Sequence, residues 1–139
     1  TLFANVFASR LSLAAQPLVH KDQNGLLTST LITTSTHFLL HAIDVLLNNQ
    51  IPATFMVLDA EKAFDPVNWD TLFFVLEKFK FLPQIIAVLR GLDSGSEAKI
   101  LINSSEVGRI VTRRGTRWGC PISPILFSLF IEPLACAVR

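Results

Sequence analysis

The sequence predicts a single α+β domain. The expected elements follow in the order two helices, a strand, two helices, a hairpin and a final helix, so the strands are few and do not alternate regularly with the helices. The chain of 139 residues suits one domain, and 50% of its residues are hydrophobic, which is enough to bury a core. The sequence contains no repeat, linker or low-complexity tract.

Two helices and a buried strand are expected in the first part of the chain. Apolar side chains at helical spacing predict a helix over residues 2–15, which Pro17 closes. A second helix is expected over residues 31–49, and the Thr and Ser residues between positions 28 and 36 leave its start open because they prefer caps to helix interiors. Residues 53–59 form a short run rich in apolar and β-forming side chains, which predicts a buried strand.

Two further helices follow this strand. Asp65 fits an N-cap, with Pro66 at the first helical position. An apolar stripe at spacings of three and four residues predicts the body of the helix: Trp69, Leu72, Phe73, Leu76 and Phe79. Pro83 then begins a short helix that runs through Leu92.

A hairpin and a last helix complete the pattern. Strands are expected over residues 99–102 and 109–112, with residues 103–108 as the turn between them. Ser123 and Pro124 then begin a helix rich in Leu, Ile and Phe, in which Pro133 predicts a kink.

The mean hydropathy of +0.48 is high for a free-standing soluble domain. It suggests either a membrane protein or a piece of a larger protein whose core-facing surfaces are bare. The most apolar stretch, residues 122–138, is interrupted by two Ser, two Pro and a Glu, whereas a spanning helix needs about 20 apolar residues. No basic region followed by an apolar block marks a signal peptide. We therefore expect a piece of a larger protein that is neither secreted nor part of a membrane.

Charge and cysteine content are less informative. The net charge of +1 does not by itself indicate nucleic-acid binding. Four arginines nevertheless fall within nine residues and form either a solvated loop or a phosphate-binding surface: Arg109, Arg113, Arg114 and Arg117. Cys120 and Cys136 lack metal-ligand spacing and are expected to be free thiols in a reducing compartment, with Cys136 a small core residue of the last helix.

Three features carry candidate chemistry. Asp59 ends the predicted buried strand, where a rigidly held carboxylate can bind a hard divalent cation. Phe64 follows five residues later, and residues 115–124 form a loop whose two glycines permit close approach of a ligand. This loop ends at a helix N-terminus, which favours anions such as phosphate. The set fits metal-assisted phosphoryl transfer, although a strand-end aspartate is more often structural than catalytic.

Residues 58–65, LDAEKAFD, resemble the first catalytic motif of reverse transcriptases from non-LTR (LINE-1-like) retrotransposons. Residues 114–124 resemble the next motif of these enzymes, and residues 126–135 resemble the helix that follows it. Upstream, residues 8–11 and 22–25 are similar to motifs on the fingers side. The matches fall in the order of the family and span nearly the whole chain, so together they are specific.

This resemblance implies roles for individual residues. Asp59 matches the catalytic, metal-binding aspartate of the palm, and the Ala60 carbonyl matches the backbone ligand of the second metal. Phe64 matches the aromatic gate beneath the incoming sugar, which blocks a 2′-OH and so selects deoxynucleotides. Trp118 and Gly119 fall in the loop that lines the nucleotide site. The implied cofactor is Mg²⁺ or Mn²⁺, as a pair of ions that activate the primer 3′-OH and steady the pyrophosphate.

The resemblance also implies partners and an architecture. The partners are an RNA template, a DNA primer and deoxynucleotides, in the nucleus or cytoplasm. The expected nucleic-acid contacts are Arg113, Arg114 and Arg117. The implied fold is an incomplete fingers and palm portion of a right-hand polymerase, as a partial reverse transcriptase domain over residues 1–139. Residues 1–52 would form fingers-side helices and residues 53–139 the first half of the palm.

The chain departs from the family pattern in three ways. The family has Gln where Trp118 stands, and an indole is bulkier and cannot accept a hydrogen bond. It often has Arg where Thr30 stands, so a cation near the triphosphate is lost. The family's third motif, with two adjacent aspartates, is not reached before Arg139, so a site built on Asp59 is not expected to hold both ions. We therefore expect a reverse transcriptase by ancestry that is inactive alone. The alternatives are a non-enzymatic nucleic-acid-binding remnant and a decayed fragment without function.

Overall fold

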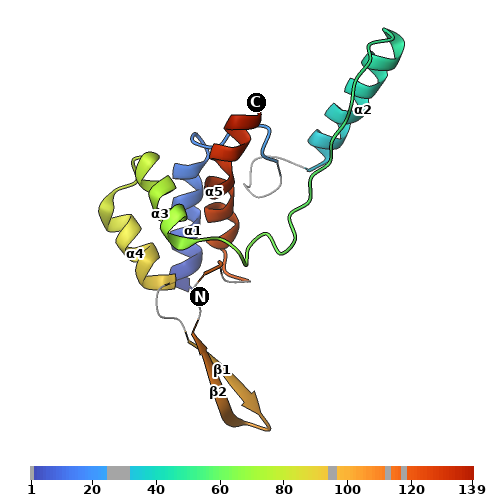
Figure 1. The fold of residues 1–139 in the computed structure, drawn as a ribbon. Helices are drawn as coiled ribbons and strands as arrows, with labels where there is room; N and C mark the ends of the chain where they lie inside the picture. The colour runs from blue at the N-terminus through green and yellow to red at the C-terminus, as the bar shows by residue number, and fades with distance from the viewer. Residues whose placement is uncertain (1, 25–31, 94–96, 112–113, 117–118) are drawn as a thin grey trace.

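The computed structural model describes residues 2–24, 32–93, 97–111, 114–116 and 119–139. Over these residues it contains five helices and one antiparallel two-stranded sheet (Figure 1). The helices are α1 (Leu2–Ala15), α2 (Ile32–Asn48), α3 (Trp69–Lys78), α4 (Pro83–Asp93) and α5 (Ser123–Val138). The strands are β1 (Glu97–Ile102) and β2 (Ser105–Val111). This mixture confirms the predicted α+β class and all of the predicted helices.

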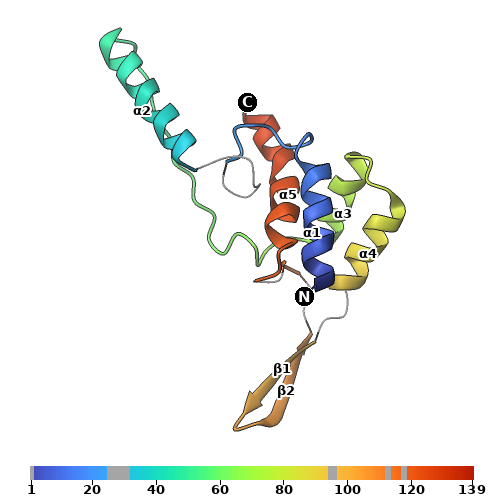
Figure 2. The same cartoon turned by 180° about the vertical axis from the view of Figure 1, so that it is seen from behind.

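Four of these helices, α1, α3, α4 and α5, form a bundle around one apolar core. Helix α5 packs against both α1 and α3, and α4 packs on α3. Figures 1 and 2 show α2 and the hairpin projecting from this bundle in different directions. The largest fully buried apolar side chains all belong to the bundle: Leu72, Leu76, Leu89, Leu129 and Val67. Burial of each such side chain stabilises the fold by about 1.5–3 kcal/mol.

The start of α3 differs from the predicted one. Asn68 is the N-cap, and its side-chain oxygen accepts a hydrogen bond from the Thr71 N–H over 3.0 Å. Asp65 lies in the preceding turn, where its N–H donates to the Lys62 carbonyl over 2.8 Å. The prediction of a cap at Asp65 with Pro66 at the first helical position is therefore wrong. Asn and Asp cap helices equally well, so residue type did not distinguish the two candidates.

The hairpin has a tighter turn than predicted. Its turn consists of Asn103 and Ser104, which both have positive φ angles, of 50° and 66°. Positive φ at both central residues is the requirement of a two-residue type I′ turn, which matches the twist of the flanking strands. Residues 105–108 consequently belong to β2 and not to the turn. The predicted strand end at Thr112 lies outside the described residues.

One face of the hairpin carries paired charges. Arg109 on β2 forms ion pairs with Glu97 across the sheet and with Glu106 on its own strand. Lys99 pairs with the same Glu106 over 3.1 Å. Exposed pairs of this kind contribute little to stability, but they occupy the Arg109 guanidinium.

The predicted buried strand over residues 53–59 is wrong. Residues 51–60 adopt no regular structure and are all exposed; the Val57 and Leu58 side chains are 91% and 83% accessible. The segment runs back along α2, which is itself largely exposed (Figure 1). A strand needs a neighbour for its backbone hydrogen bonds, and no described strand pairs with these residues.

A clamp of three hydrogen bonds joins two loops that are far apart in the sequence. The Gly115 N–H donates to the Val67 carbonyl over 2.8 Å, and the Thr116 N–H donates to the Phe64 carbonyl over 3.0 Å. The Trp69 indole N–H donates to the Gly115 carbonyl over 2.8 Å. We call this set the loop clamp. It fixes the segment before α3 against the segment that leads to α5.

Gly115 is required for the loop clamp on two grounds. Its φ angle of +88° lies in the left-handed region that L side chains rarely adopt. A Cβ at this position would lie 2.8 Å from the Asp65 carbonyl oxygen, a backbone atom that cannot rotate away. Glycine therefore permits both the turn and the close approach of the two loops.

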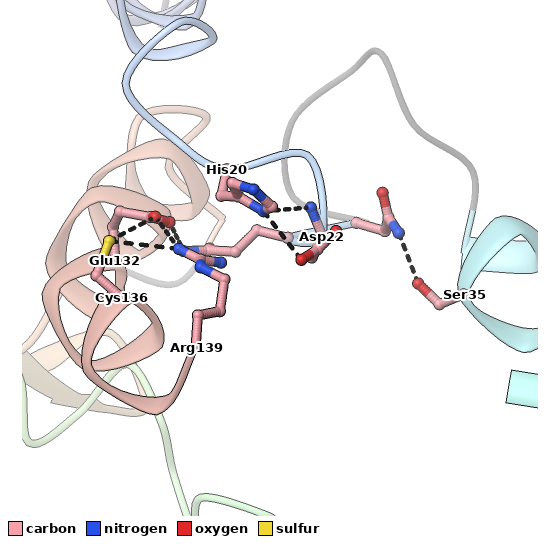
Figure 3. A network of polar contacts seen from close by, with 8 residues as sticks. His20, Asp22, Ser35, Glu132, Cys136 and Arg139 are labelled. Carbon is pink, nitrogen blue, oxygen red and sulfur yellow. Dashed lines mark hydrogen bonds and ion pairs between the residues drawn. The ribbon is translucent and has the colours of Figure 1, made fainter. Parts of the chain in front are cut away.

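A buried carboxylate ties α5 to the segment that follows α1. Glu132 is 3% exposed and accepts hydrogen bonds from the Gln23 amide, the Arg139 guanidinium and the Cys136 thiol. Figure 3 shows Glu132, Cys136 and Arg139 converging on α5, with the segment after α1 beside them. We call Gln23, Glu132, Cys136 and Arg139 the Glu132 cluster. Cys136 itself is exposed, so its prediction as a core residue is wrong; both cysteines are free thiols, as expected.

The Glu132 cluster lowers the pKa of its carboxyl group. Burial raises the pKa of Glu132. Hydrogen bonds from the Cys136 thiol, the His20 backbone and Gln23 lower this pKa, and so does the positive charge of Arg139. The lowering contributions together exceed the effect of burial, so the pKa lies below its ordinary value of 4.5. The ionised form is therefore the one that the fold stabilises.

Among the described residues, no helix combines the length and the apolar character that crossing a bilayer requires.

We predict that Gly115→Ala lowers the free energy of unfolding by about 2–5 kcal/mol. The left-handed φ angle costs about 1–2 kcal/mol for alanine, and the contact with the Asp65 carbonyl costs about 1–3 kcal/mol. Urea denaturation followed by circular dichroism measures the loss.

Gly119→Ala is the matched control for this variant. Gly119 also has a positive φ angle, of +74°, but a Cβ there would meet nothing within 4 Å. The Gly119→Ala variant should therefore lose only the cost of the left-handed φ angle, about 1–2 kcal/mol of unfolding free energy. Equal losses at the two glycines would show that the loop contact is unimportant.

We predict that the Glu132 cluster makes stability depend on pH in the acid range. Because the folded-state pKa is depressed, the contribution of Glu132 is complete above its unfolded value and disappears as the pH falls through the folded value, below 4.5. Glu132→Gln should cost about 1–3 kcal/mol at neutral pH and flatten this acid dependence. Unfolding curves at several pH values measure both effects. Glu77→Gln, at an exposed position on α3, should leave the pH dependence of the parent chain unchanged.

Candidate functional site

Phe64 lies at the centre of the candidate site, in the segment before α3. The turn before it includes Lys62, whose φ angle of 51° is unusual for a residue other than glycine. The half-buried Phe64 ring packs on Phe127 of α5, with 5.0 Å between the ring centroids and 51° between the planes. Its carbonyl accepts the loop-clamp hydrogen bond from Thr116. Both the ring and the backbone of Phe64 are therefore held in position.

A cavity of about 400 Å³ lies beside the Phe64 ring. The loop that precedes α5 supplies most of its wall, including Gly119 and Cys120, and the first turn of α5 supplies Ser123. Asn5 on α1 completes the lining. The volume falls in the range of cavities that hold small organic ligands, about 300–1,000 Å³.

Asn5 was not predicted as a site residue. It lies three residues before the motif that begins at Ala8, and no pattern around it marks a function. Only the packing of α1 against α5 brings its side chain to the cavity.

Three details of the loop before α5 suit a ligand site. An added Cβ at Gly119 would meet open space, so this backbone is accessible from the cavity side. The Thr116 side chain is 5% exposed, and its hydroxyl has no hydrogen-bond partner among the described residues. The N-cap of α5, Ile122, makes no side-chain hydrogen bond. The positive end of the α5 dipole therefore faces the loop without a capping side chain.

Asp59 lies apart from this cavity. It and Ala60 belong to the exposed segment, and neither is among the described residues that line the cavity. Within the described ranges, no group of three or more His, Cys, Asp or Glu side chains could hold a metal ion. A single exposed carboxylate does not hold a pair of hard cations, which need several oxygen ligands each. The described residues therefore do not form a two-metal centre.

The predicted basic contacts are only partly described. Arg114 is exposed beside the loop clamp, whereas Arg113, Arg117 and Trp118 lie outside the described residues. Arg109, which belongs to the same cluster in the sequence, is engaged by two glutamates on the hairpin. The structure thus brings Phe64 and Gly119 to one cavity but does not bring Asp59 to it.

Comparison with known proteins identifies the family. The model of the reverse transcriptase (RNA-dependent DNA polymerase) family matches residues 2–139. The chain is 30% identical over 138 residues to the Transposon TX1 uncharacterized 149 kDa protein of Xenopus laevis, covering 99% of this chain and 11% of that protein. It is 30% identical over 83 residues to the retrovirus-related Pol polyprotein from type-1 retrotransposable element R2 of Popillia japonica, covering 59% of this chain and 12% of that protein.

The chain thus spans about a tenth of the length of these relatives, both of which are proteins of mobile elements. The family match runs through every motif on which the resemblance rested, from the first helix to the last. The chain therefore belongs to the reverse transcriptase (RNA-dependent DNA polymerase) family, as a segment of the non-LTR retrotransposon type.

Proposed function

We propose that this segment forms the nucleotide-selecting part of a retrotransposon reverse transcriptase, an RNA-directed DNA polymerase. Residues 1–52 would contribute to the fingers and residues 53–139 to the first half of the palm. The observation that carries the proposal is the Phe64 ring, held at the wall of a 400 Å³ cavity by Phe127 and the loop clamp.

The proposed role of Phe64 is steric. A ring that packs on a second ring cannot swing aside without losing that contact, which is worth about 0.5–1.5 kcal/mol beyond its buried area. A hydroxyl on the 2′ carbon of an incoming sugar would then meet the ring, whereas a deoxyribose would fit. Selection of deoxynucleotides follows from the rigidity of the gate and not from a hydrogen bond.

The loop before α5 is the proposed cradle for the rest of the nucleotide. Gly119 permits close approach of the ligand, and the positive end of the α5 dipole favours the negative charge of a phosphate. By correspondence with the family, Trp118 stands in the sequence where a nucleotide-site Gln is found. The exposed Arg114, with Arg113 and Arg117, is the proposed contact with the phosphates of an RNA template and DNA primer.

Asp59 and the Ala60 carbonyl are proposed as metal ligands only by correspondence with the family, for which Mg²⁺ or Mn²⁺ is expected. Because the described residues do not fit a pair of divalent ions, we derive no chemical step through them. The function supported here is selection of the nucleotide, and transfer of the nucleotidyl group needs further ligands around Asp59.

We predict that the chain binds dUTP more tightly than UTP, which differs from it only by the 2′-OH, and that Phe64→Ala removes the difference. A pocket that rejects one additional group typically discriminates by about 1–3 kcal/mol, or roughly 10- to 200-fold. Titration of the isotope-labelled chain with each nucleotide, followed by two-dimensional NMR, measures both affinities and shows whether the Gly119 and Cys120 signals move.

Phe74→Ala is the control for that titration. Phe74 lies on α3, is 56% exposed and does not line the cavity, so its loss should leave the discrimination intact. Equal affinity of the unmodified chain for dUTP and UTP would refute the gate.

We predict that the chain alone does not extend an oligo(dT) primer on poly(rA) with Mg²⁺ or Mn²⁺. The reason is that Asp59 is exposed and that, among the described residues, it belongs to no group of three or more side chains that could hold a metal ion. Incorporation of labelled dTTP provides the readout. Incorporation that Asp59→Ala abolishes would contradict this prediction and show that the site assembles on its own.

A further inference from the structure

A second cavity lies on the opposite side of α1 from α5. Its volume is about 420 Å³, and it runs between α1 and the connection from α3 to α4. Residues 79–82 and Ile85 form one wall, and α1 forms the other. The lining is apolar apart from two cations, and it contains no acidic residue among those described. We call this cavity the α1 groove.

The α1 wall of the groove has the spacing of a helix-binding surface. Phe7, Leu11 and Ala14 line it at intervals of four and three residues. Phe3 stacks on Phe7 with 5.8 Å between the ring centroids and is 59% exposed, so the stripe continues one turn further. The twelve residues from Phe3 to Ala14 extend about 16 Å along the helix axis. This length and period match the i, i+3, i+4 and i+7 anchors of an amphipathic helix.

The two cations stand on different walls of the groove. Arg10 belongs to α1 and Lys80 to the connection after α3, and both are exposed. Neither forms an ion pair with another described residue, in contrast to Arg109 and Arg139. They are therefore available to a charged partner on both sides of the apolar stripe.

Lys80 has a backbone conformation that glycine adopts at a lower energy cost. Its φ angle of 61° is left-handed, and its N–H donates to the Glu77 carbonyl over 2.9 Å as the chain leaves α3. Glycine is the usual residue at such a helix end, and another residue costs about 1 kcal/mol more. The chain thus holds a lysine at the groove where backbone geometry favours glycine.

We propose that the α1 groove binds an acidic amphipathic helix of a partner protein. Apolar side chains of that helix would fill the space over Ala14, and acidic side chains on its flanks would meet Arg10 and Lys80. The apolar lining with only two cations does not suit a nucleic-acid backbone, which needs many phosphate contacts. Among the described helices of this chain, the exposed α2 carries one acid, Asp44, so charge favours a different protein over a second copy.

The test uses two fluorescein-labelled helical peptides of about four turns each. Both carry Leu at the helix-binding spacing; one has Glu on its flanks and the other has Lys. Fluorescence anisotropy with the unmodified chain should show binding of the Glu peptide and about tenfold weaker binding of the Lys peptide. The double variant Arg10→Glu/Lys80→Glu should reverse this preference.

Two further variants distinguish binding of the Glu peptide in the groove from non-specific adsorption to the chain. Ala14→Trp fills the groove from an exposed position and should abolish binding of the Glu peptide. Lys78→Glu changes an exposed lysine that lies over the Phe74 ring outside the groove and should leave binding within about twofold. Circular dichroism checks that each variant folds, and Leu82→Asp, at an exposed position on the other wall, provides a second groove variant.

Three results would overturn the proposal. The first is that charge reversal leaves the peptide preference unchanged. The second is that an oligonucleotide displaces the Glu peptide, which would assign the groove to nucleic acid. The third is that the chain self-associates and Ala14→Trp makes it monomeric, which would assign the groove to a second copy. None of these results bears on the Phe64 cavity, so failure here leaves the proposed nucleotide selection intact.

Discussion

The loop clamp joins the segment before α3 to residues 115 and 116, which are far away in the sequence. Two of its hydrogen bonds link backbone atoms, from Gly115 to Val67 and from Thr116 to Phe64, and the third comes from the Trp69 indole. The backbone of Phe64 and the indole of Trp69 are held by these bonds. Because a Cβ at Gly115 would lie 2.8 Å from the Asp65 carbonyl oxygen, this close contact favours glycine at that position.

The chain therefore presents a site in two unequal parts. The part around Phe64 is organised: the ring packs on Phe127, and the Phe64 carbonyl accepts the hydrogen bond from Thr116. The acidic part, at Asp59, is exposed and lies on a segment without regular structure. Rigid positioning is what a site needs for selectivity and for catalysis alike. The described structure supplies it at Phe64 and not at Asp59.

The high mean hydropathy has a structural counterpart. Bare apolar side chains gather on α2, on residues 51–58 and along the α1 groove, while the bundle core itself is well filled. The groove combines this apolar surface with cations on both sides, Arg10 and Lys80, that pair with no other described residue. That combination gives the groove a chemical preference that the other bare faces lack.

The sequence by itself predicted the helices and the family. Local signals suffice for these, since the apolar stripe of α3 and the prolines that start α4 and α5 act over a few residues. The same signals failed for residues 53–59, where β-forming side chains indicated a strand but no described strand pairs with them. They also failed to choose Asn68 over Asp65 as the cap of α3. Only the tertiary structure decided that Asn5 lines the Phe64 cavity and that Asp59 does not, because these positions depend on contacts between segments far apart in the chain.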